Sequence, residues 1–309
     1  MTNIEWTDET WNPTVGCSIV SPGCHNCYAM RMAKRLQSME RPEYADVIDR
    51  GGRWTGTVIE LPERLDQPLK WKKPRRIFVD SMSDLFHESV SDKFIAAVFG
   101  VMGAANWHTF QVLTKRPERA VEFFRWLVRQ GDHHSATHDY VCLHHAQKLC
   151  DHAGLRHVSR GESLPAAWPL PNVWLGVSCE DQKRADERIP LLLSLPAGVR
   201  FVSAEPLLGP IGFQISNLKS QINWVIVGGE SGPGARECDI AWMRSIVMQC
   251  QAAGVAVFVK QLGAKPFNWH FGGTVENSLI ALTDRKGGDW DEFPAQLRIR
   301  EFPTVGVPA

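Results

Sequence analysis

Six short apolar runs recur along the chain, about 25–40 residues apart in most cases, with longer polar or mixed stretches between them. The runs are Ile77–Asp80, Phe110–Thr114, Val173–Ser178, Val199–Ser203, Trp224–Val227 and Val255–Lys260. Near-continuous runs of β-branched and other apolar residues are typical of parallel strands that are buried on both faces. The pattern therefore predicts a parallel sheet rather than an antiparallel one.

The stretches between the runs predict helices. Four are expected, at Lys93–Met102, Glu118–Arg129, Gln182–Ser194 and Ile240–Ala253. Alternation of strands and helices indicates βαβ units, and a further strand leading into Cys17 brings the expected number to about seven. We predict an α/β fold, namely a partial or irregular TIM-like (β/α) barrel over residues 1–263. An open doubly wound sheet is the alternative.

Two further segments lie outside this repeat. Residues 131–170 form a predicted insertion, because seven of the eleven histidines fall between His133 and His157. A hairpin or helical lid with solvent-facing histidines is the favoured interpretation, and the ligand-like spacing makes a second metal, zinc or an auxiliary cluster, the alternative. The residues concerned are Cys142, His144, His145, Cys150 and His152. Residues 264–309 are expected to form a small β-rich appendage around a turn at Lys286–Asp289.

Composition narrows the class of protein. The chain has 309 residues, of which 44% are hydrophobic and 22% charged, as in soluble globular proteins. There is no apolar run near 18 residues and no signal-peptide pattern, so we expect a cytoplasmic protein without a membrane span. In a reducing compartment, eight cysteines favour metal binding or catalysis over disulfides. The formal net charge of +0 means that any nucleic-acid binding needs a local basic patch.

The strongest chemical signal is a loop with three cysteines, Cys17, Cys24 and Cys27, interrupted by Gly16 and by Pro22–Gly23. Three thiolates around one metal centre leave one coordination position open, as in reactive sites, whereas structural zinc sites are closed by four ligands. An iron–sulfur cluster with an open iron is the favoured interpretation. A zinc knuckle completed by His25, a disulfide with a spare thiol, and unconnected buried thiols are the alternatives. The isolated Cys179, Cys238 and Cys250 are expected to be ordinary buried thiols.

Polar residues follow the predicted strands, where the active sites of barrels lie. They are Ser81, Ser83, Asp84, Lys115, Arg116, Ser178, Glu180, Glu205, Glu230, Lys260 and Gln261, and Gly228 and Gly229 begin a Gly-rich turn that would let the backbone approach a ligand. Each could instead be solvated or could cap a helix. Among twelve tryptophans, Trp174 and Trp224 are expected in the core. Trp6, Trp11 and Trp54 are candidates for a base-binding pocket or for the core.

Asn12-Pro13, Gly16-Cys17 and Cys27-Tyr28-Ala29, followed by the basic residues Arg31, Lys34 and Arg35, resemble the cluster loop of spore photoproduct lyase-like radical S-adenosylmethionine enzymes. The resemblance implies a 4Fe–4S cluster on the three cysteines and a bound S-adenosylmethionine, cleaved to a 5′-deoxyadenosyl radical. It implies cofactor contacts from nine of the strand-end residues and substrate contacts from five basic or aromatic ones. The first are Ser81, Ser83, Asp84, Ser178, Glu180, Glu205, Gly228, Gly229 and Glu230, and the second are Tyr28, Arg31, Lys115, Arg116 and Lys260.

Over nearly its whole length the chain is similar to the phage Gp37/Gp68-like family. The similarity is carried by Ser81–His87, Leu113–Pro117, Gly176–Asp181, Ser203–Pro210 and Gly228–Gly232. The two resemblances together imply an enzyme acting on thymine in DNA, as a repair lyase, or on a modified thymidine, as a hypermodification isomerase. Its partners would be a nucleic acid or nucleotide and an electron donor such as a flavodoxin or ferredoxin. The alternatives are a non-enzymatic zinc or iron–sulfur protein that binds nucleic acid or a phage partner, and a barrel that senses redox state.

Overall fold

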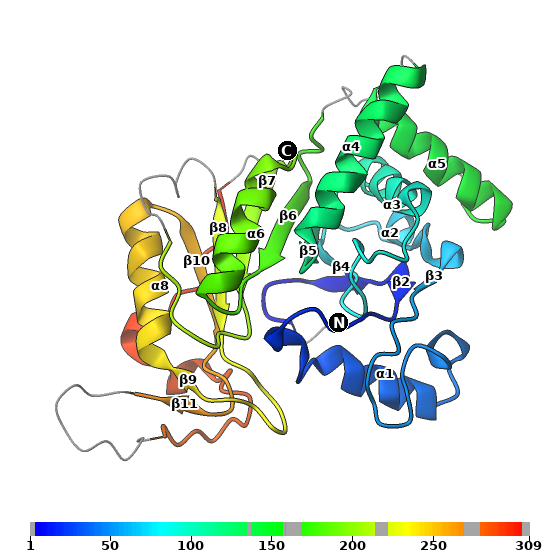
Figure 1. Cartoon of the computed structure of the whole chain (residues 1–309). Coiled ribbons are helices and arrows are strands. Elements are labelled where there is room, and N and C mark those ends of the chain that lie inside the picture. The colour runs from blue at the N-terminus through cyan, green and yellow to red at the C-terminus, as the bar shows by residue number, and fades with distance from the viewer. Residues whose placement is uncertain are drawn as a thin grey trace. The chain divides into compact units, whose positions relative to one another are not determined.

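The computed structural model of the chain describes residues 4–134, 137–156, 158, 168–213, 222–268 and 279–304. Two compact units are distinguished (Figure 1). Unit 1 comprises Met1–Val20, Cys27–Leu175 and Ser194–Gly198, and unit 2 comprises Ser21–Asn26, Gly176–Leu193 and Val199–Ala309. The division falls inside strand β6 (Val173–Ser178), and the domain boundary near residue 263 stays a prediction.

Unit 1 is built on parallel strands in the order β1 (Glu9–Trp11), β4 (Arg76–Val79), β5 (Thr109–Thr114) and the first half of β6. Trp11 is paired with Val79, and Val79 in turn with Val112. A short antiparallel pair, β2 (Thr14–Val15) with β3 (Ile59–Glu60), follows β1. The side chains of β4 and β5 are mostly buried, as expected for strands that are covered on both faces.

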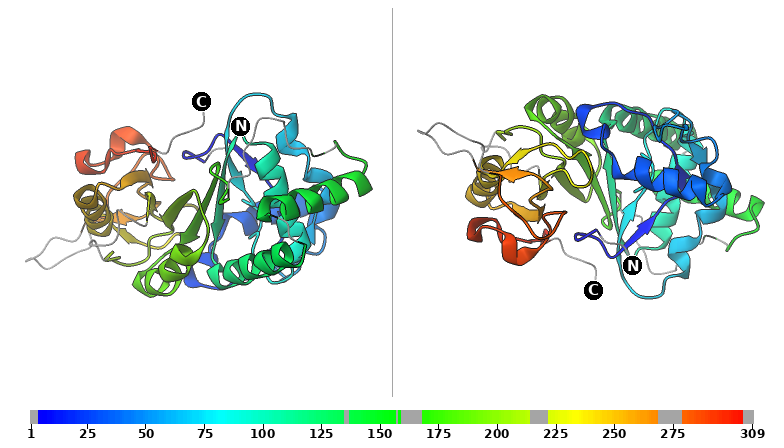
Figure 2. Two further views of the ribbon diagram at one scale, coloured as in Figure 1. Left: turned by 90° about the horizontal axis from the view of Figure 1, so that it is seen from above. Right: turned by 90° about the horizontal axis from the view of Figure 1, so that it is seen from below.

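The helices of unit 1 are α1 (Tyr28–Ser38), α2 (Gln67–Lys70), α3 (Asp92–Ala104), α4 (Pro117–His134) and α5 (His138–His152), with 3₁₀ turns at Pro42–Tyr44 and Pro62–Arg64. Helices α3 and α5 lie side by side (Figures 1 and 2). Gly100 permits this, because a Cβ atom there would lie 2.2 Å from the carbonyl oxygen of Cys142. The Ser91 side chain caps α3 by accepting the Phe94 N–H.

Unit 2 continues with the second half of β6, β7 (Val199–Ala204), β8 (Trp224–Gly228) and β10 (Ala256–Gln261), again parallel and in that order. Its long helices are α6 (Gln182–Ser194) and α8 (Ile240–Ala253), and α8 packs on β8 and β10. Gly254 ends α8 in the left-handed conformation, with φ of 64°. A 3₁₀ turn, Pro22–Cys24, and a two-residue parallel pair, β9 (Cys238–Asp239) with β11 (Pro266–Phe267), also belong to this unit.

The predicted parallel α/β class is confirmed. In each unit the strand order follows the chain without a reversal, which is the order of a partial TIM-like barrel. A doubly wound sheet would instead reverse its strand order at a switch point. Strand β6 and helices α6 and α8 have the predicted bounds, whereas α4 runs on to His134. Among the described residues, no helix combines the length and the apolar character needed to cross a membrane.

The His-rich insertion is helical over the part that the structure describes. Cys142 and Cys150 lie on the buried side of α5, and burial raises the pKa of Cys150 to about 11. Burial also lowers the pKa of His145 to about 4. Two thiols that resist ionisation are poor metal ligands, so the predicted second metal gains no support here. His157 and Pro165 lie outside the described residues.

The C-terminal segment differs from the predicted β-rich appendage. Its described part contains only the two-residue β11, isolated bridges, and the 3₁₀ turns Trp290–Glu292 and Ala295–Leu297. Side chains take the place of ladder partners: Glu292 accepts the N–H groups of Thr283 and Asp284, and Asp284 accepts that of Gly288. Local side-chain bonds of this kind compete with strand formation.

Four of the described tryptophans belong to the buried core, and they include both strand-start residues that were predicted there. Trp174 and Trp224 are buried, as predicted. Trp6 and Trp11 are also buried: Trp6 packs against Phe78, and the Nε1–H of Trp11 donates to the carbonyl oxygen of Arg64 at 2.8 Å. The hypothesis that Trp6 and Trp11 line a base-binding pocket is therefore wrong.

Asp80 is a buried acid directly after β4. Its φ of 58° places it in the left-handed region, and its N–H donates to the Trp11 carbonyl at 2.8 Å. The Thr14 N–H donates to its Oδ1 at 3.0 Å. Burial raises the pKa of Asp80 to about 8, although the Thr14 N–H acts in the opposite direction. The carboxyl group is thus held largely protonated below that pH.

We expect Asp80 to make the protein less stable as the pH rises. Its contribution to the free energy of unfolding is fully present below its ordinary pKa of 3.8 and is lost as the pH rises toward about 8, because the unfolded chain gives up this proton first. The slope is at most about 1.4 kcal/mol per pH unit. Asp80→Asn keeps an oxygen for Thr14 and tolerates the left-handed backbone. Urea unfolding at pH 5 and pH 8 should show the variant gaining on the wild type at the higher pH, whereas a constant difference would contradict this.

Candidate functional site

The first cysteine of the loop is held by the segment that follows β4. Gly16 has φ of 93°, and a Cβ atom there would lie 2.1 Å from the Thr57 carbonyl oxygen, so only glycine fits. Its N–H donates to the Met82 carbonyl at 3.2 Å, and its own carbonyl accepts the Ser83 hydroxyl at 2.6 Å. Cys17 therefore directly follows a residue whose N–H and carbonyl groups are both hydrogen-bonded.

Arg116, two residues after β5, reaches the same part of the loop. Its guanidinium donates from Nε to Glu88 at 2.9 Å and from Nη2 to the Ser18 hydroxyl at 2.6 Å, and Nη1 lies 4.0 Å from the sulfur of Cys17. The side chain is 8% exposed. The predicted substrate residue Arg116 is thus engaged with the cysteine loop.

Ser18 and His87 lie within hydrogen-bonding distance, with 2.9 Å between Oγ and Nε2. The Ser89 N–H donates to Nδ1 of His87 at 3.2 Å, so Nδ1 carries no proton. Burial, together with the charge of Arg116, lowers the pKa of His87, so the ring is neutral and its proton is on Nε2. Nε2 therefore donates to Ser18 and is not a base for it, which excludes a serine nucleophile activated by this histidine.

Asp84 fixes the end of β5 in unit 1. Its oxygens accept the Thr114 hydroxyl at 2.7 Å, the Lys115 N–H at 3.0 Å and the Phe86 N–H at 3.1 Å. A buried carboxylate requires such donors. Asp84, predicted as a cofactor contact, therefore organises the backbone on which Lys115 and Arg116 stand.

The other predicted residues of unit 1 surround the start of α1. Cys27 is the N-cap of this helix and packs against a small apolar cluster that includes Met30 and Met82. The Tyr28 hydroxyl donates to the Ser81 carbonyl at 2.8 Å, although 48% of Tyr28 is exposed. The Ser81 hydroxyl donates to the Asn12 side chain at 3.1 Å, and Arg31 is exposed one helical turn later.

In unit 2, Glu180 supports the segment Ser21–Asn26. Its Oε1 accepts the Gly23 N–H at 3.3 Å, and its Oε2 pairs with Arg188 at 3.0 Å. A Cβ atom at Gly23 would lie 3.1 Å from the Glu180 carboxyl carbon, so the contact is close. Arg188 also donates to the Ser178 carbonyl at 2.7 Å. Glu180 is fully buried and is a structural partner of the cysteine loop.

Glu230, after β8, makes the second attachment of the same segment. Asn26 donates to its Oε2 at 3.0 Å, as does Nε of Arg236 at 2.9 Å, and Arg236 also reaches the Pro22 carbonyl at 2.9 Å. Burial acts to raise the pKa of Glu230, but the hydrogen bonds from Arg236 and Asn26 outweigh it and hold the pKa below its ordinary value. Glu230 is therefore a carboxylate that anchors the loop around Cys24.

The glycines after β8 allow close packing against protein groups. A Cβ atom at Gly228 would lie 2.5 Å from Oε1 of Glu205, and one at Gly229 would lie 2.2 Å from the Leu262 carbonyl oxygen. Glu205 itself pairs with Lys260 at 3.0 Å, and both side chains keep some exposure, 14% and 21%. This pair is the most accessible of the predicted polar residues in unit 2.

The three loop cysteines suit an iron–sulfur centre by donor type. None of the eight cysteines forms a disulfide, and Cys17, Cys24 and Cys27 are partly exposed, whereas the other five are buried, Cys179, Cys238 and Cys250 as predicted. Within the described ranges, no three His, Cys, Asp or Glu side chains form a group that could hold a metal ion. The cluster and its bound S-adenosylmethionine stay predictions.

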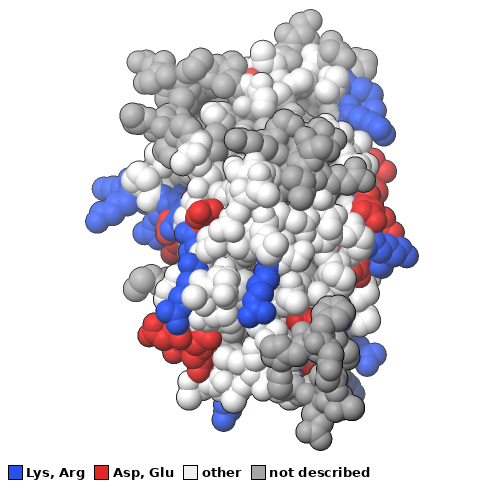
Figure 3. All heavy atoms as spheres, turned by 90° about the vertical axis from the view of Figure 1, so that its left-hand side faces the viewer, with Lys and Arg blue, Asp and Glu red and all other residues white. Residues whose placement is uncertain are grey.

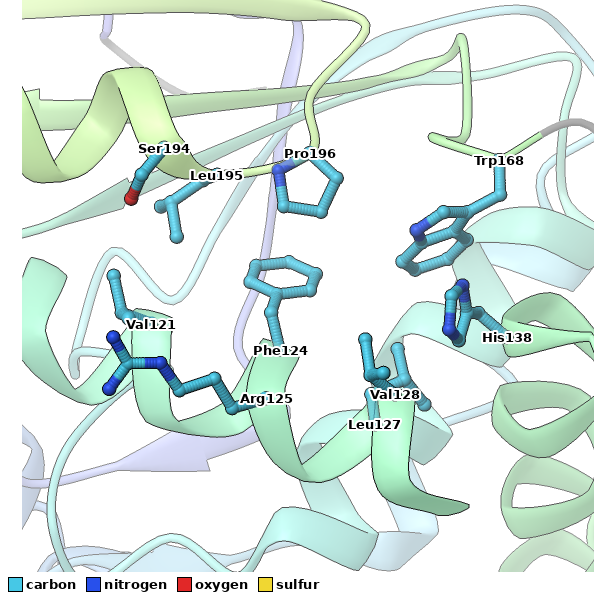
Figure 4. Close-up of a pocket in the computed structure, with 10 residues that line it drawn as sticks. All are labelled: Val121, Phe124, Arg125, Leu127, Val128, His138, Trp168, Ser194, Leu195 and Pro196. Carbon is cyan, nitrogen blue, oxygen red and sulfur yellow. The ribbon is translucent and has the colours of Figure 1, made fainter. Parts of the chain in front are cut away.

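One cavity of the described chain contains none of these residues. It lies in unit 1, has a volume of about 280 Å³, and is lined mainly by apolar side chains (Figure 4). Phe124 of α4 points toward Pro196, and His138 lies beside the Trp168 ring, with 5.5 Å between the ring centres. None of the predicted site residues lines it. Figure 3 shows basic and acidic residues interspersed on the face that it presents, without one continuous basic surface.

The family of proteins described as "Protein of unknown function (DUF5131)" matches residues 1–294. The chain belongs to this family. No curated protein and no solved structure matches the chain. The family description names no activity, so the resemblances to radical enzymes and to the phage family stay predictions for this DUF5131 member.

Several residues of the site were not predicted. They are Asn12, Ser18, Asn26, His87, Glu88, Arg188 and Arg236. Their roles depend on contacts between distant parts of the chain: 204 residues separate Asn26 from Glu230. Only the paired spacing of Glu180 and Arg188, across the first turns of α6, offered a local signal.

We expect Glu180→Gln to destabilise the protein by about 3–5 kcal/mol, because it leaves the buried Arg188 charge without its partner. Glu187→Gln is the matched control, because Glu187 lies on α6 next to Arg188. Its ion pair with Lys183, at 3.9 Å, is exposed, and its loss should change stability by less than about 1 kcal/mol. Urea unfolding measures both, and equal effects of the two substitutions would show that Glu180 does not anchor the fold.

Proposed function

We propose that this protein is a radical S-adenosylmethionine enzyme that carries a 4Fe–4S cluster on Cys17, Cys24 and Cys27. One observation supports this most. The cysteine loop is divided between the two units, and within each unit its residues bond to residues that directly follow parallel strands. Ser18 binds Arg116 after β5, Gly23 binds Glu180 after β6, and Asn26 binds Glu230 after β8. Barrel enzymes place their chemistry at this end of the strands.

The residues of the loop suit this role. Three partly exposed thiols lie on one short loop, residues 17–27, free of disulfides, and Cys27 stands at the positive end of α1. When bound, such a cluster supplies one electron to cleave S-adenosylmethionine and yield a 5′-deoxyadenosyl radical. The contribution of the chain is to hold the ligands, orient the cofactor and exclude water.

The polar groups of unit 2 divide into supports and cofactor contacts. Glu180 and Glu230 are 0% and 6% exposed and are saturated by Arg188, Arg236 and loop donors. They support the loop. Glu205 and Lys260 are more accessible and carry both an acceptor and a donor, so we propose this pair as the polar contact for the cofactor.

The proposed substrate is thymine or a modified thymidine in DNA. Tyr28 follows Cys27 directly and is half exposed, and Arg31 is exposed on the same helix. An aromatic ring beside a cation suits a base stacked next to its phosphate, and stacking contributes about 1–3 kcal/mol. A duplex base would have to be flipped out to react. Because the net charge is +0, binding would be modest and salt-sensitive.

We expect Cys17→Ala, Cys24→Ala and Cys27→Ala each to abolish iron binding, because each removes one of three ligands. Iron and sulfide per chain, measured after anaerobic reconstitution, provide the readout. Cys250→Ala is the control, since Cys250 is buried in α8 and should leave the iron content unchanged. Undiminished iron in all three loop variants would refute the cluster. A colourless protein that binds zinc instead would favour the non-enzymatic alternative.

The reaction is tested with DNA that carries deuterium in the thymine methyl group. Incubation with S-adenosylmethionine and a one-electron reductant should produce 5′-deoxyadenosine that contains deuterium, as detected by mass spectrometry. The matched control is the Cys24→Ala protein, which should give none. If 5′-deoxyadenosine forms without deuterium in the presence of DNA, and with deuterium only from a labelled peptide or metabolite, the DNA assignment fails although the radical chemistry stands.

A further inference from the structure

We infer that Arg116, acting through Ser18, is a positioning residue that fixes the Cys17 end of the loop and provides a positive N–H group beside the sulfur of Cys17. We call the set of bonds from Arg116 to Ser18 the clamp. The effect of Arg116 on an iron–sulfur cluster rests on the proposed function, whereas the clamp itself is a feature of unit 1 and does not. It also gives Arg116 a role different from the predicted contact with substrate phosphates.

The guanidinium of Arg116 is fully used inside the protein. Nε bonds Glu88 at 2.9 Å, Nη1 lies 3.8 Å from Oδ2 of Asp84 and 4.0 Å from the sulfur of Cys17, and Nη2 bonds Ser18. Only 8% of the side chain is exposed. A guanidinium has five N–H groups in one plane, and here they are directed to four residues. A substrate phosphate would have to displace these partners.

Ser18 converts these bonds into a fixed backbone position. Its hydroxyl oxygen accepts from Arg116 Nη2 at 2.6 Å and from His87 Nε2, which the Ser89 N–H makes the protonated nitrogen, at 2.9 Å. Both lone pairs are then occupied, so the hydroxyl proton is directed to Glu88, whose Oε1 lies 3.4 Å away. The Ser18 carbonyl also lies 3.4 Å from Nη2. One peptide bond joins this restrained residue to Cys17.

The guanidinium of Arg116 is the positive group beside the Cys17 sulfur, and it favours a negative charge on that sulfur. Asp84 and Glu88 lie on the guanidinium and keep it charged, and burial strengthens the interaction of that charge with its neighbours. Hydrogen bonds and positive charge near the sulfur ligands of an iron–sulfur cluster raise its reduction potential. Arg116 would therefore make the cluster easier to reduce, while it holds the first ligand in place.

The test compares Arg116→Gln and Arg116→Lys with Arg119→Gln. Arg119 lies three residues after Arg116, in α4, and pairs with Asp92 at 2.7 Å. Among the described residues it forms no hydrogen bond with Ser18 or Cys17, so its substitution controls for the loss of a cation. The first readout is hydrogen exchange of the amides of residues 16–19 in the metal-free protein. We expect exchange at least about tenfold faster in Arg116→Gln, partial rescue in Arg116→Lys, and no change in Arg119→Gln.

The second readout is the reduction potential of the reconstituted cluster, which should fall in Arg116→Gln and stay unchanged in Arg119→Gln. Ser18→Ala, which removes only the hydroxyl, gives a milder test if Arg116→Gln does not fold, and it should also speed exchange at residues 16–19. Unchanged exchange in both Arg116→Gln and Ser18→Ala overturns the clamp. If exchange rises but the wild-type protein holds no iron, the clamp stands and the proposed function fails. If exchange rises and the potential does not move, the electrostatic part of the inference is overturned.

Discussion

A carboxylate that is buried beyond the end of a strand needs hydrogen-bond donors, and this requirement organises the cysteine loop. In unit 2, Glu180 and Glu230 take their donors from Gly23 and Asn26 as well as from arginines. Removal of one member would leave a buried charge without compensation, which is strongly unfavourable. The two carboxylates hold the loop, and the loop in turn supplies donors that the buried carboxylates need. Its conformation therefore depends on these bonds as well as on apolar packing.

The same constraint operates in unit 1 with the signs exchanged. There the buried cation is Arg116, and the cysteine loop supplies acceptors through Ser18. Asp84 and Glu88 balance the charge, and His87 is held neutral with its proton toward Ser18. Ser18 therefore lies next to His87 but is not activated as a nucleophile. Nε2 of His87 donates the hydrogen bond and so cannot accept the serine proton.

These contacts refine the proposed chemistry. Glu180, Glu230 and Arg116 are buried charged residues that follow strands, and their side chains are hydrogen-bonded within the protein. Such residues suit a structural role. Glu205, Lys260 and Tyr28 are more exposed, and in the proposed function they are the contacts for cofactor and substrate. An enzyme that generates a radical needs a rigid, dry support around a few reactive groups. Under the proposed function, the bonds between the loop and strand-end residues within each unit would supply such a support.

The sequence by itself determined the parallel α/β class, most element positions and the three-cysteine loop, because near-continuous apolar strands, amphipathic helices and Gly-Pro interruptions are local properties. It also indicated that polar residues gather after the strands. It did not determine what those residues do. Glu180 and Glu230 were predicted to contact a cofactor, and Trp6 and Trp11 to line a base pocket or to belong to the core. Tertiary contacts bond the two glutamates to the loop and bury the two tryptophans. In the described part of residues 264–309, turns are held by bonds from side chains, which a pattern of strands and turns did not predict. Pairings such as Asn26 with Glu230 and Arg116 with Ser18 join residues far apart in the chain, so burial and the need to satisfy buried charge decided them only once the fold had formed.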